Sequence, residues 1–113
     1  MNIGILEVEN NQKDQETFYN IIDKDTNMVV GILFTVENHV VYEIKKEFRG
    51  NGAATAALRE VTKKLHNPVL EIDINNMASK RVALKAGYAL VEKDHKWEIY
   101  KFLGEEAKKV AVR

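Results

Sequence analysis

The stretch RGNGAAT, Arg49 to Thr55, decides the fold that we expect for this chain. Its two glycines, Gly50 and Gly52, allow the backbone to turn sharply and to approach a ligand closely. The alanines that follow have side chains too small to block that approach. The stretch lies between an apolar run typical of a strand and a run with helical periodicity, so it predicts a glycine loop at the start of a helix.

A helix that begins at this loop has unpaired backbone N–H groups in its first turn. With a partial positive charge of roughly half an elementary charge, such a helix start binds anions, most naturally phosphate. A plain strand-to-helix turn explains the two glycines equally well. The loop is no dinucleotide fingerprint, because Thr55 stands where GxGxxG needs its third glycine, and no GK[ST] follows to make a P-loop.

The periodicity of the apolar residues predicts strands on both sides of two helices. The expected strands are 2–9, 17–22, 28–36, 40–45, 69–74, 88–92 and 97–102, and the expected helices are 54–65 and 77–86. The first four strands should form an antiparallel meander, and Gly87 is a natural left-handed stop for the second helix. We expect one domain over residues 1–113, with a weakly helical tail over 104–113.

The composition predicts an ordinary globular domain without a metal site. The 113 residues, 45% of them hydrophobic, suffice for one core. The chain has no cysteine, and its three histidines are scattered singly, which argues against a metal cluster. The net charge of zero argues against nucleic acid as the main ligand. We find no membrane-spanning run or signal peptide and expect no membrane partner and a cytoplasmic location.

The loop belongs to the first of two motifs. Arg49, Gly52 and Ala54 fit the pattern R/Q-x-x-G-x-G/A. The pattern of Asn, two residues, Ser or Ala, and then Lys-x-Gly-Phe/Tyr is met by Asn76, Ser79, Lys85, Gly87 and Tyr88. Both motifs, in this order, resemble those of the GNAT family of acyl-coenzyme A N-acyltransferases. The residues of the two motifs are most similar to those of the RimJ/RimL-type branch, which acetylates the N-termini of ribosomal proteins. The resemblance covers about residues 17–102.

The resemblance implies an α/β (α+β) GNAT fold: a central mixed, mostly antiparallel sheet with two main helices. It also implies acetyl-coenzyme A as co-substrate and no metal. In the family, amides of the glycine loop hold the coenzyme A pyrophosphate. That loop maps onto Arg49, Gly50, Asn51, Gly52, Ala53, Ala54 and Thr55.

Further site residues follow from the same resemblance. The family strand before the loop pairs with the pantetheine arm through its backbone, which maps onto Ile44, Lys45 and Lys46. Asn76 would hydrogen-bond the coenzyme, and a helix N-cap is its alternative role, compatible with the first. Ser79 belongs to the same cofactor-binding set, although a structural role suits it better.

Attack of an amine on the thioester requires the ammonium to lose a proton first. Glu43 is the first candidate for the base, because it lies on the strand before the loop, on the side opposite Tyr42. His39 shares the side of Glu43 and is the second candidate. Either residue is equally explained as a solvated surface group. A backbone N–H of this strand is the candidate for stabilising the oxyanion.

The chain departs from the family pattern at two places. Many members carry a tyrosine, the acid for the departing thiolate, where this chain has Ala83. A simple thiol has a pKa of roughly 8.5, so the thiolate leaves without a strong acid; Tyr42, Ser79 or water remain open as donors. Members also place two helices between the first and second strands, where only the polar segment 10–16 lies here.

Those N-terminal helices wall the acceptor pocket in the family. We therefore expect an acceptor side that is open, or completed by a homodimer, and a large or exposed amine as acceptor. The sequence predicts an acetyl-coenzyme A-dependent N-acetyltransferase acting on a primary amine of a peptide, protein or small molecule. The alternative is a non-catalytic module that binds coenzyme A or a protein partner. A dinucleotide-binding oxidoreductase is disfavoured, because repeated βαβ units are absent.

Overall fold

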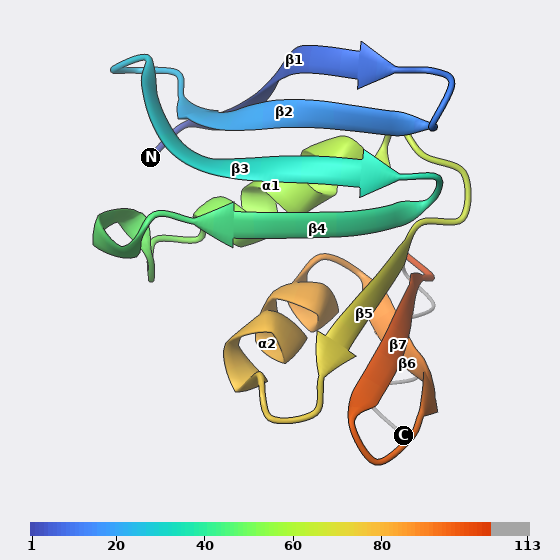
Figure 1. Cartoon of the computed structure of the whole chain (residues 1–113). Helices are drawn as coiled ribbons and strands as arrows, with labels where there is room; N and C mark the ends of the chain where they lie inside the picture. Colours follow the sequence, from blue (N-terminus) through green and yellow to red (C-terminus); the bar gives the residue numbers. More distant parts are fainter. Residues whose placement is uncertain (105–113) are drawn as a thin grey trace.

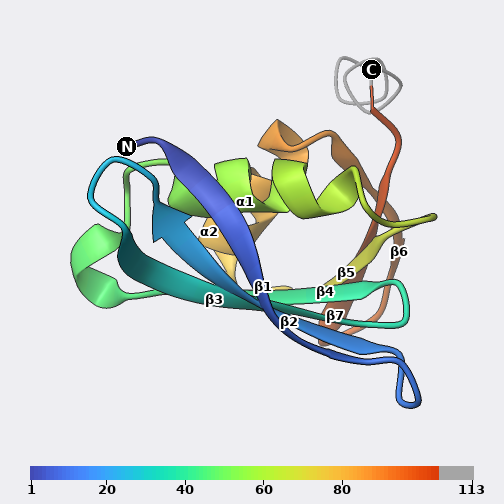
Figure 2. The ribbon, with the colours of Figure 1, turned by 90° about the horizontal axis from the view of Figure 1, so that it is seen from above.

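The computed structural model, which describes residues 1–104, contains a seven-stranded sheet with two helices on one side (Figures 1 and 2). The elements in chain order are β1 (Ile3–Asn11), β2 (Glu16–Asp23), β3 (Met28–Val36), β4 (His39–Ile44), a 3₁₀ turn η1 (Lys46–Phe48), α1 (Ala53–Thr62), β5 (Val69–Asp73), α2 (Met77–Lys85), β6 (Tyr88–Lys93) and β7 (Trp97–Phe102). Across the sheet the strands follow the order β1-β2-β3-β4-β5-β7-β6. Only β4 and β5 are parallel neighbours, so the predicted mixed, mostly antiparallel sheet is confirmed.

Each predicted strand and helix is present, and the differences lie at the ends. β1 continues to Asn11 because that residue pairs with Glu16 in a hairpin. α1 ends at Thr62, earlier than the predicted 65, because the N–H groups of Lys64 and Leu65 donate to the carbonyls three residues before them. Such bonds tighten the last turn of a helix into a 3₁₀ geometry. The predicted tail falls almost entirely outside the described residues.

The hairpin between β1 and β2 replaces the two helices that the family resemblance places there. The Gln15 N–H donates to the Gln12 carbonyl at 3.3 Å, and the Asn11 side chain donates to Asp14 at 2.8 Å. These contacts close a short polar turn between two long strands. The expectation that both N-terminal helices are missing is therefore confirmed.

The hydrophobic core lies between the sheet and the two helices. Its largest side chains without exposed surface include Ile21 and Leu33 of the sheet, Leu58 of α1, and Tyr88. Gly87, which ends α2 as predicted, has a φ of +93°. In this left-handed region glycine carries no steric penalty.

The opposite face of the four N-terminal strands carries apolar side chains that no described helix covers. We call this surface the outer face and define it by Leu6, Phe18, Ile32, Phe34 and Val41. The strand register brings these residues to one side, and the Phe18 and Phe34 rings stack with centroids 5.5 Å apart. Leu6, Ile32 and Val41 are about half exposed. An apolar patch of this kind on a sheet is typical of an interaction surface.

The strands β4 and β5 are paired at one position, His39 with Val69, and then separate (Figure 1). The Val69 N–H donates to the Asn38 carbonyl across this junction, whereas the Lys45 N–H donates to Val30 on the other side of β4. Successive residues of a strand direct their N–H and C=O groups to opposite neighbours. The even-numbered residues of β4, including Tyr42 and Ile44, therefore direct theirs into the gap towards β5.

Gly31 of β3 permits the close approach of β4 on the edge opposite this gap. A Cβ atom at Gly31 would lie 2.5 Å from the Glu43 carbonyl oxygen. We expect Gly31→Ala to displace β4 and to lower the free energy of unfolding by about 1–3 kcal/mol, as overpacking does. Urea denaturation measures this loss. Gly4→Ala is the matched control, because its Cβ would meet only the flexible end of Lys24; equal losses in both variants would contradict the account.

Candidate functional site

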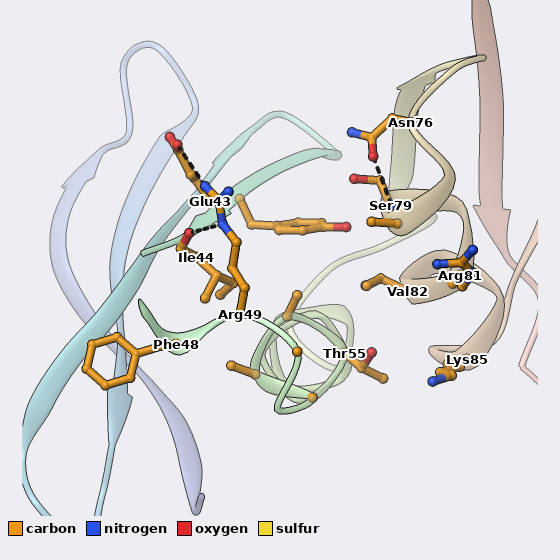
Figure 3. A pocket seen from close by; sticks show the side chains of 16 residues that line it. Glu43, Ile44, Phe48, Arg49, Thr55, Asn76, Ser79, Arg81, Val82 and Lys85 are labelled. Carbon is orange, nitrogen blue, oxygen red and sulfur yellow. Dashed lines mark hydrogen bonds and ion pairs between the residues drawn. The ribbon is translucent and has the colours of Figure 1, made fainter. Parts of the chain in front are cut away.

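A pocket of about 510 Å³ lies between β4, the glycine loop, the first turn of α1 and one face of α2 (Figure 3). Most of the residues predicted for the site line it: Glu43, Ile44, Arg49, Gly50, Gly52, Ala53, Ala54, Thr55, Asn76 and Ser79. The structure thus brings residues of both sequence motifs together in one cavity. His39, Lys45, Lys46 and Asn51 do not line it.

The glycine loop leaves the start of α1 open. Gly50 and Gly52 have φ angles of +82° and +78°, and no atom lies within 4 Å of the position that a Cβ would take at either residue. No side chain caps α1, and its first turn holds no acidic residue. The first helical bond runs from the Ala56 N–H to the Gly52 carbonyl at 3.1 Å. The N–H groups of residues 53–55 therefore have no partner within the helix and are available to an anion.

Basic side chains surround this helix start. Arg81 and Lys85 of α2 line the pocket, and Figure 3 shows Lys85 facing Thr55 of α1. Arg81 was missed in the sequence, and Lys85 entered only as part of a motif. The sequence does contain a pattern that indicates their place, because residues 78, 81, 82 and 85 are spaced to lie on one face of a helix. All four line the pocket.

Arg49 ties the glycine loop to the end of β4. Its Nε donates to the Ile44 carbonyl at 2.9 Å, and its Nη2 lies 3.8 Å from Oε1 of Glu43 (Figure 3). Both charged side chains are more than half exposed, so their ion pair contributes little to stability. The hydrogen bond to Ile44 instead fixes where the loop sits relative to the gap between β4 and β5.

Of the three residues predicted to pair with the pantetheine arm, Ile44 alone lies in the pocket. Lys45 directs its N–H to β3, and Lys46 begins the 3₁₀ turn η1. The strand alternation explains the difference, since only every second residue of β4 faces the gap. Tyr42, which the sequence did not place among the cofactor-binding residues, meets this condition and lines the pocket.

The two candidate bases lie at different ends of β4. His39 sits at the junction with Val69, and Glu43 sits four residues further along. At about 3.3 Å per residue this separates them by roughly 13 Å. Both are exposed, but only Glu43 lines the pocket, beside the glycine loop.

Asn76 is the N-cap of α2. Its side-chain oxygen accepts a hydrogen bond from the Ser79 N–H at 3.1 Å, so the capping role suggested by the sequence is confirmed (Figure 3). The amide NH₂ group of Asn76 makes no hydrogen bond to another described residue. Ala83, the position of the family tyrosine, has no exposed surface and belongs to the core rather than to the pocket.

Tyr42 contributes the most unusual polar group of the site. Among the described residues, its hydroxyl oxygen is the only buried side-chain nitrogen or oxygen without a hydrogen-bond partner. Burial raises the pKa of this phenol, and a polar contact with the Ser79 side chain, which does not meet hydrogen-bond geometry, lowers it. The group is therefore a neutral donor at physiological pH.

A second polar cluster holds α2 against the sheet outside the pocket. Lys80 of α2 lies 3.3 Å from the buried carboxylate of Glu98 on β7, which also accepts a bond from the Tyr100 hydroxyl at 2.7 Å. The Tyr100 bond, followed by Lys80, lowers the pKa of Glu98 against the opposing effect of burial. This ionised contact orients the first turn of α2, where Asn76 and Ser79 lie.

Residues 1–104 offer neither a membrane-spanning helix nor a metal site of the usual kinds. None of the helices there has the length and apolar character needed to cross a membrane. No cluster of three or more histidine, aspartate or glutamate side chains in that part of the chain is arranged to hold a metal ion.

The sequence matches no protein-family model and no curated protein. Its structure, however, is similar to solved acetyltransferases. RimL, a ribosomal L7/L12 alpha-N-protein acetyltransferase in complex with coenzyme A, matches with a TM-score of 0.70 and 18% identity over 83% of this chain. The microcin C7 self-immunity acetyltransferase MccE, in complex with acetyl-CoA and AMP, matches with 0.68 and 19% over 80%. A GNAT-family acetyltransferase from Bacillus anthracis matches with 0.67 and 20% over 78%.

This chain covers 65% of the RimL chain, 62% of the MccE chain and 66% of the Bacillus anthracis chain. It therefore spans about two thirds of the length of these proteins. No helix lies between β1 and β2 of this chain. The protein has the fold of the GNAT acetyltransferases, RimL among them, in a form without the two N-terminal helices.

Proposed function

We propose that this protein binds acetyl-coenzyme A in the pocket and transfers the acetyl group to a primary amine of a peptide, protein or small molecule. One observation carries the proposal. The uncapped start of α1 lies behind two left-handed glycines, next to the unpaired backbone of β4. The solved structures of RimL and MccE, which hold coenzyme A and acetyl-CoA, support the same ligand.

The phosphate end of the coenzyme suits the glycine loop. A pyrophosphate accepts hydrogen bonds from the N–H groups of residues 53–55 and gains from the helix dipole. Arg81 and Lys85 add charge-assisted contacts on the opposite wall. Glu43, which lies 3.8 Å from Arg49, is the only acidic residue of the described part of the chain that lines the pocket.

The pantetheine arm suits the gap. It is an extended chain with its own amide groups, so it can pair with a strand as an added strand does. Tyr42 and Ile44 supply backbone groups that face the gap, and the apolar side chain of Val82 lines the pocket as well. The thioester would then lie further along β4, away from the loop.

The reaction joins the acceptor nitrogen to the acetyl carbon and breaks the bond from that carbon to sulfur. Glu43 is our candidate to take the proton from the amine, directly or through water, since it lines the pocket whereas His39 does not. The Tyr42 N–H faces the gap and is our candidate donor to the oxyanion. The sulfur leaves as a thiolate and regains a proton.

A second candidate function is a binding module that holds coenzyme A without turnover. Two observations favour it: Ala83 supplies no hydroxyl where many GNAT members have tyrosine, and the outer face lacks the helices that wall the acceptor pocket in the family. The unpaired hydroxyl of Tyr42 and the exposed carboxylate of Glu43 favour a catalytically active acetyltransferase over a binding module.

We expect coenzyme A to stabilise the protein against heat. At about 100 times the Kd a ligand adds about 2.7 kcal/mol, which raises the Tm of a domain of this size by roughly ten degrees or more. Gly52→Glu should abolish the shift, because a carboxylate would occupy the anion site. Gly52→Ala shares the backbone strain at φ +78° without the charge and should keep most of the shift. No shift in the unmodified protein would refute the proposal.

Turnover is measured as free thiol released from acetyl-coenzyme A with a panel of amines and N-terminal peptides. An enzyme should release thiol in proportion to acceptor, and Glu43→Gln should slow the release by about 10²-fold or more, as loss of a general base does. His39→Gln is the matched control and should leave the rate unchanged. If the coenzyme binds and no acceptor yields thiol, the binding module is correct.

We also propose that a second copy of the chain covers the outer face and completes the acceptor side. Sedimentation at micromolar concentration should then give the mass of a dimer. Val41→Lys places a charge on this face and should shift the protein to a monomer, whereas Leu84→Lys, at an equally exposed apolar residue of α2, should not. A monomeric mass for the unmodified protein would contradict this part of the proposal.

A further inference from the structure

The Tyr42 hydroxyl is buried in the free protein without a hydrogen-bond partner among the described residues. Leaving a buried hydroxyl unpaired costs free energy that a phenylalanine at the same position would avoid. Such a group is therefore explained best by a partner that the free protein lacks. The residue lines the pocket, so a ligand in the pocket is the natural partner.

The position of Tyr42 indicates which part of a ligand it reaches. Alternation along β4 directs the Tyr42 side chain to the helix side, where Ser79 at the start of α2 is its neighbour. The glycine loop lies at the opposite end, beyond Ile44 and Arg49. A ligand with phosphate at the loop and an arm along β4 therefore brings its far end to Tyr42.

This inference rests on the proposed function, in which that far end is the thioester. We propose that the Tyr42 hydroxyl donates a hydrogen bond to the sulfur of the coenzyme and stabilises the thiolate as the carbon–sulfur bond breaks. Tyr42 on β4 thus performs the role of the tyrosine that many GNAT members carry on the helix, at the position where this chain has Ala83.

The proton balance needs no transfer from tyrosine. The amine nitrogen gives one proton to the base or to water, the electron pair of the broken bond goes to sulfur, and the thiolate regains a proton from the base or water. Tyr42 donates a hydrogen bond throughout and stays neutral. Burial disfavours the phenolate, so the hydroxyl keeps its hydrogen for the sulfur.

Binding of the coenzyme with and without its sulfur tests the inference without an acceptor. Calorimetry compares coenzyme A with desulfo-coenzyme A at pH 9, where a thiol of pKa about 8.5 is largely thiolate. Tyr42→Phe should weaken coenzyme A binding about tenfold, the loss of one hydrogen bond to a charged group. It should change desulfo-coenzyme A binding less than twofold.

Tyr19→Phe is the matched control, since Tyr19 is a buried tyrosine of β2 outside the pocket. It should leave both affinities unchanged. The free Tyr42→Phe protein should also have a higher Tm than the unmodified protein, because the unpaired hydroxyl is gone. A structural role for Tyr42 would instead lower the Tm.

Besides a lower Tm of the free Tyr42→Phe protein, three results would overturn the inference. The first is an equal loss of affinity for both ligands in Tyr42→Phe, and the second is no loss for either. The third is that Ser79→Ala, and not Tyr42→Phe, removes the discrimination between the two ligands. If the unmodified protein binds neither ligand, the proposed function itself fails, and this inference with it.

Discussion

The parallel strands β4 and β5 share a single paired position, and the site depends on their separation. If the two strands were paired along their whole length, the backbone N–H and C=O groups of Tyr42 and Ile44 would be hydrogen-bonded within the sheet. Because they diverge beyond His39 and Val69, the edge of β4 that faces the pocket has no strand beside it, and there the Ile44 carbonyl accepts a hydrogen bond from Arg49. Buried backbone groups require partners, so this edge creates a demand that an extended ligand with amide groups can satisfy.

The glycine loop and α1 are placed by the same separation. α1 is the crossover between the two parallel strands, so its N-terminus must lie at the carboxyl end of β4. The Arg49 side chain then fixes the loop to the Ile44 carbonyl. An anion site and a strand edge are thus set end to end, which matches a ligand with phosphates at one end and a linear arm at the other.

Much of this could be predicted from the sequence, because local patterns determine it. Alternation and helical periodicity gave the strands and helices, and the two glycines gave a loop with left-handed residues. The sequence did not place Arg81 in the pocket, nor Tyr42 among its cofactor-binding residues, and the reasons differ. Arg81 depends on which face α2 turns to the pocket, a matter of packing. The unpaired state of the Tyr42 hydroxyl depends on groups that are absent around it, and no local pattern encodes that.

The acceptor side shows the limit of the comparison with solved acetyltransferases. The polar turn between β1 and β2 removes the family's wall, and the outer face that remains is apolar around Phe18 and Phe34. Exposed apolar surface on a four-stranded sheet is costly in water and favours a covering partner. In the proposed function, local motifs therefore build the half of the site that holds the donor, whereas the acceptor half depends on what meets this surface.

The central claim is that the open start of α1 and the free edge of β4 hold one coenzyme A molecule. An NMR titration of the ¹⁵N-labelled protein tests it most directly, since it follows each backbone amide. We expect the signals of Gly52, Ala53, Ala54 and Tyr42 to shift together, with one saturation curve. Shifts confined to other surfaces, or no shifts at saturating coenzyme A, would contradict the account.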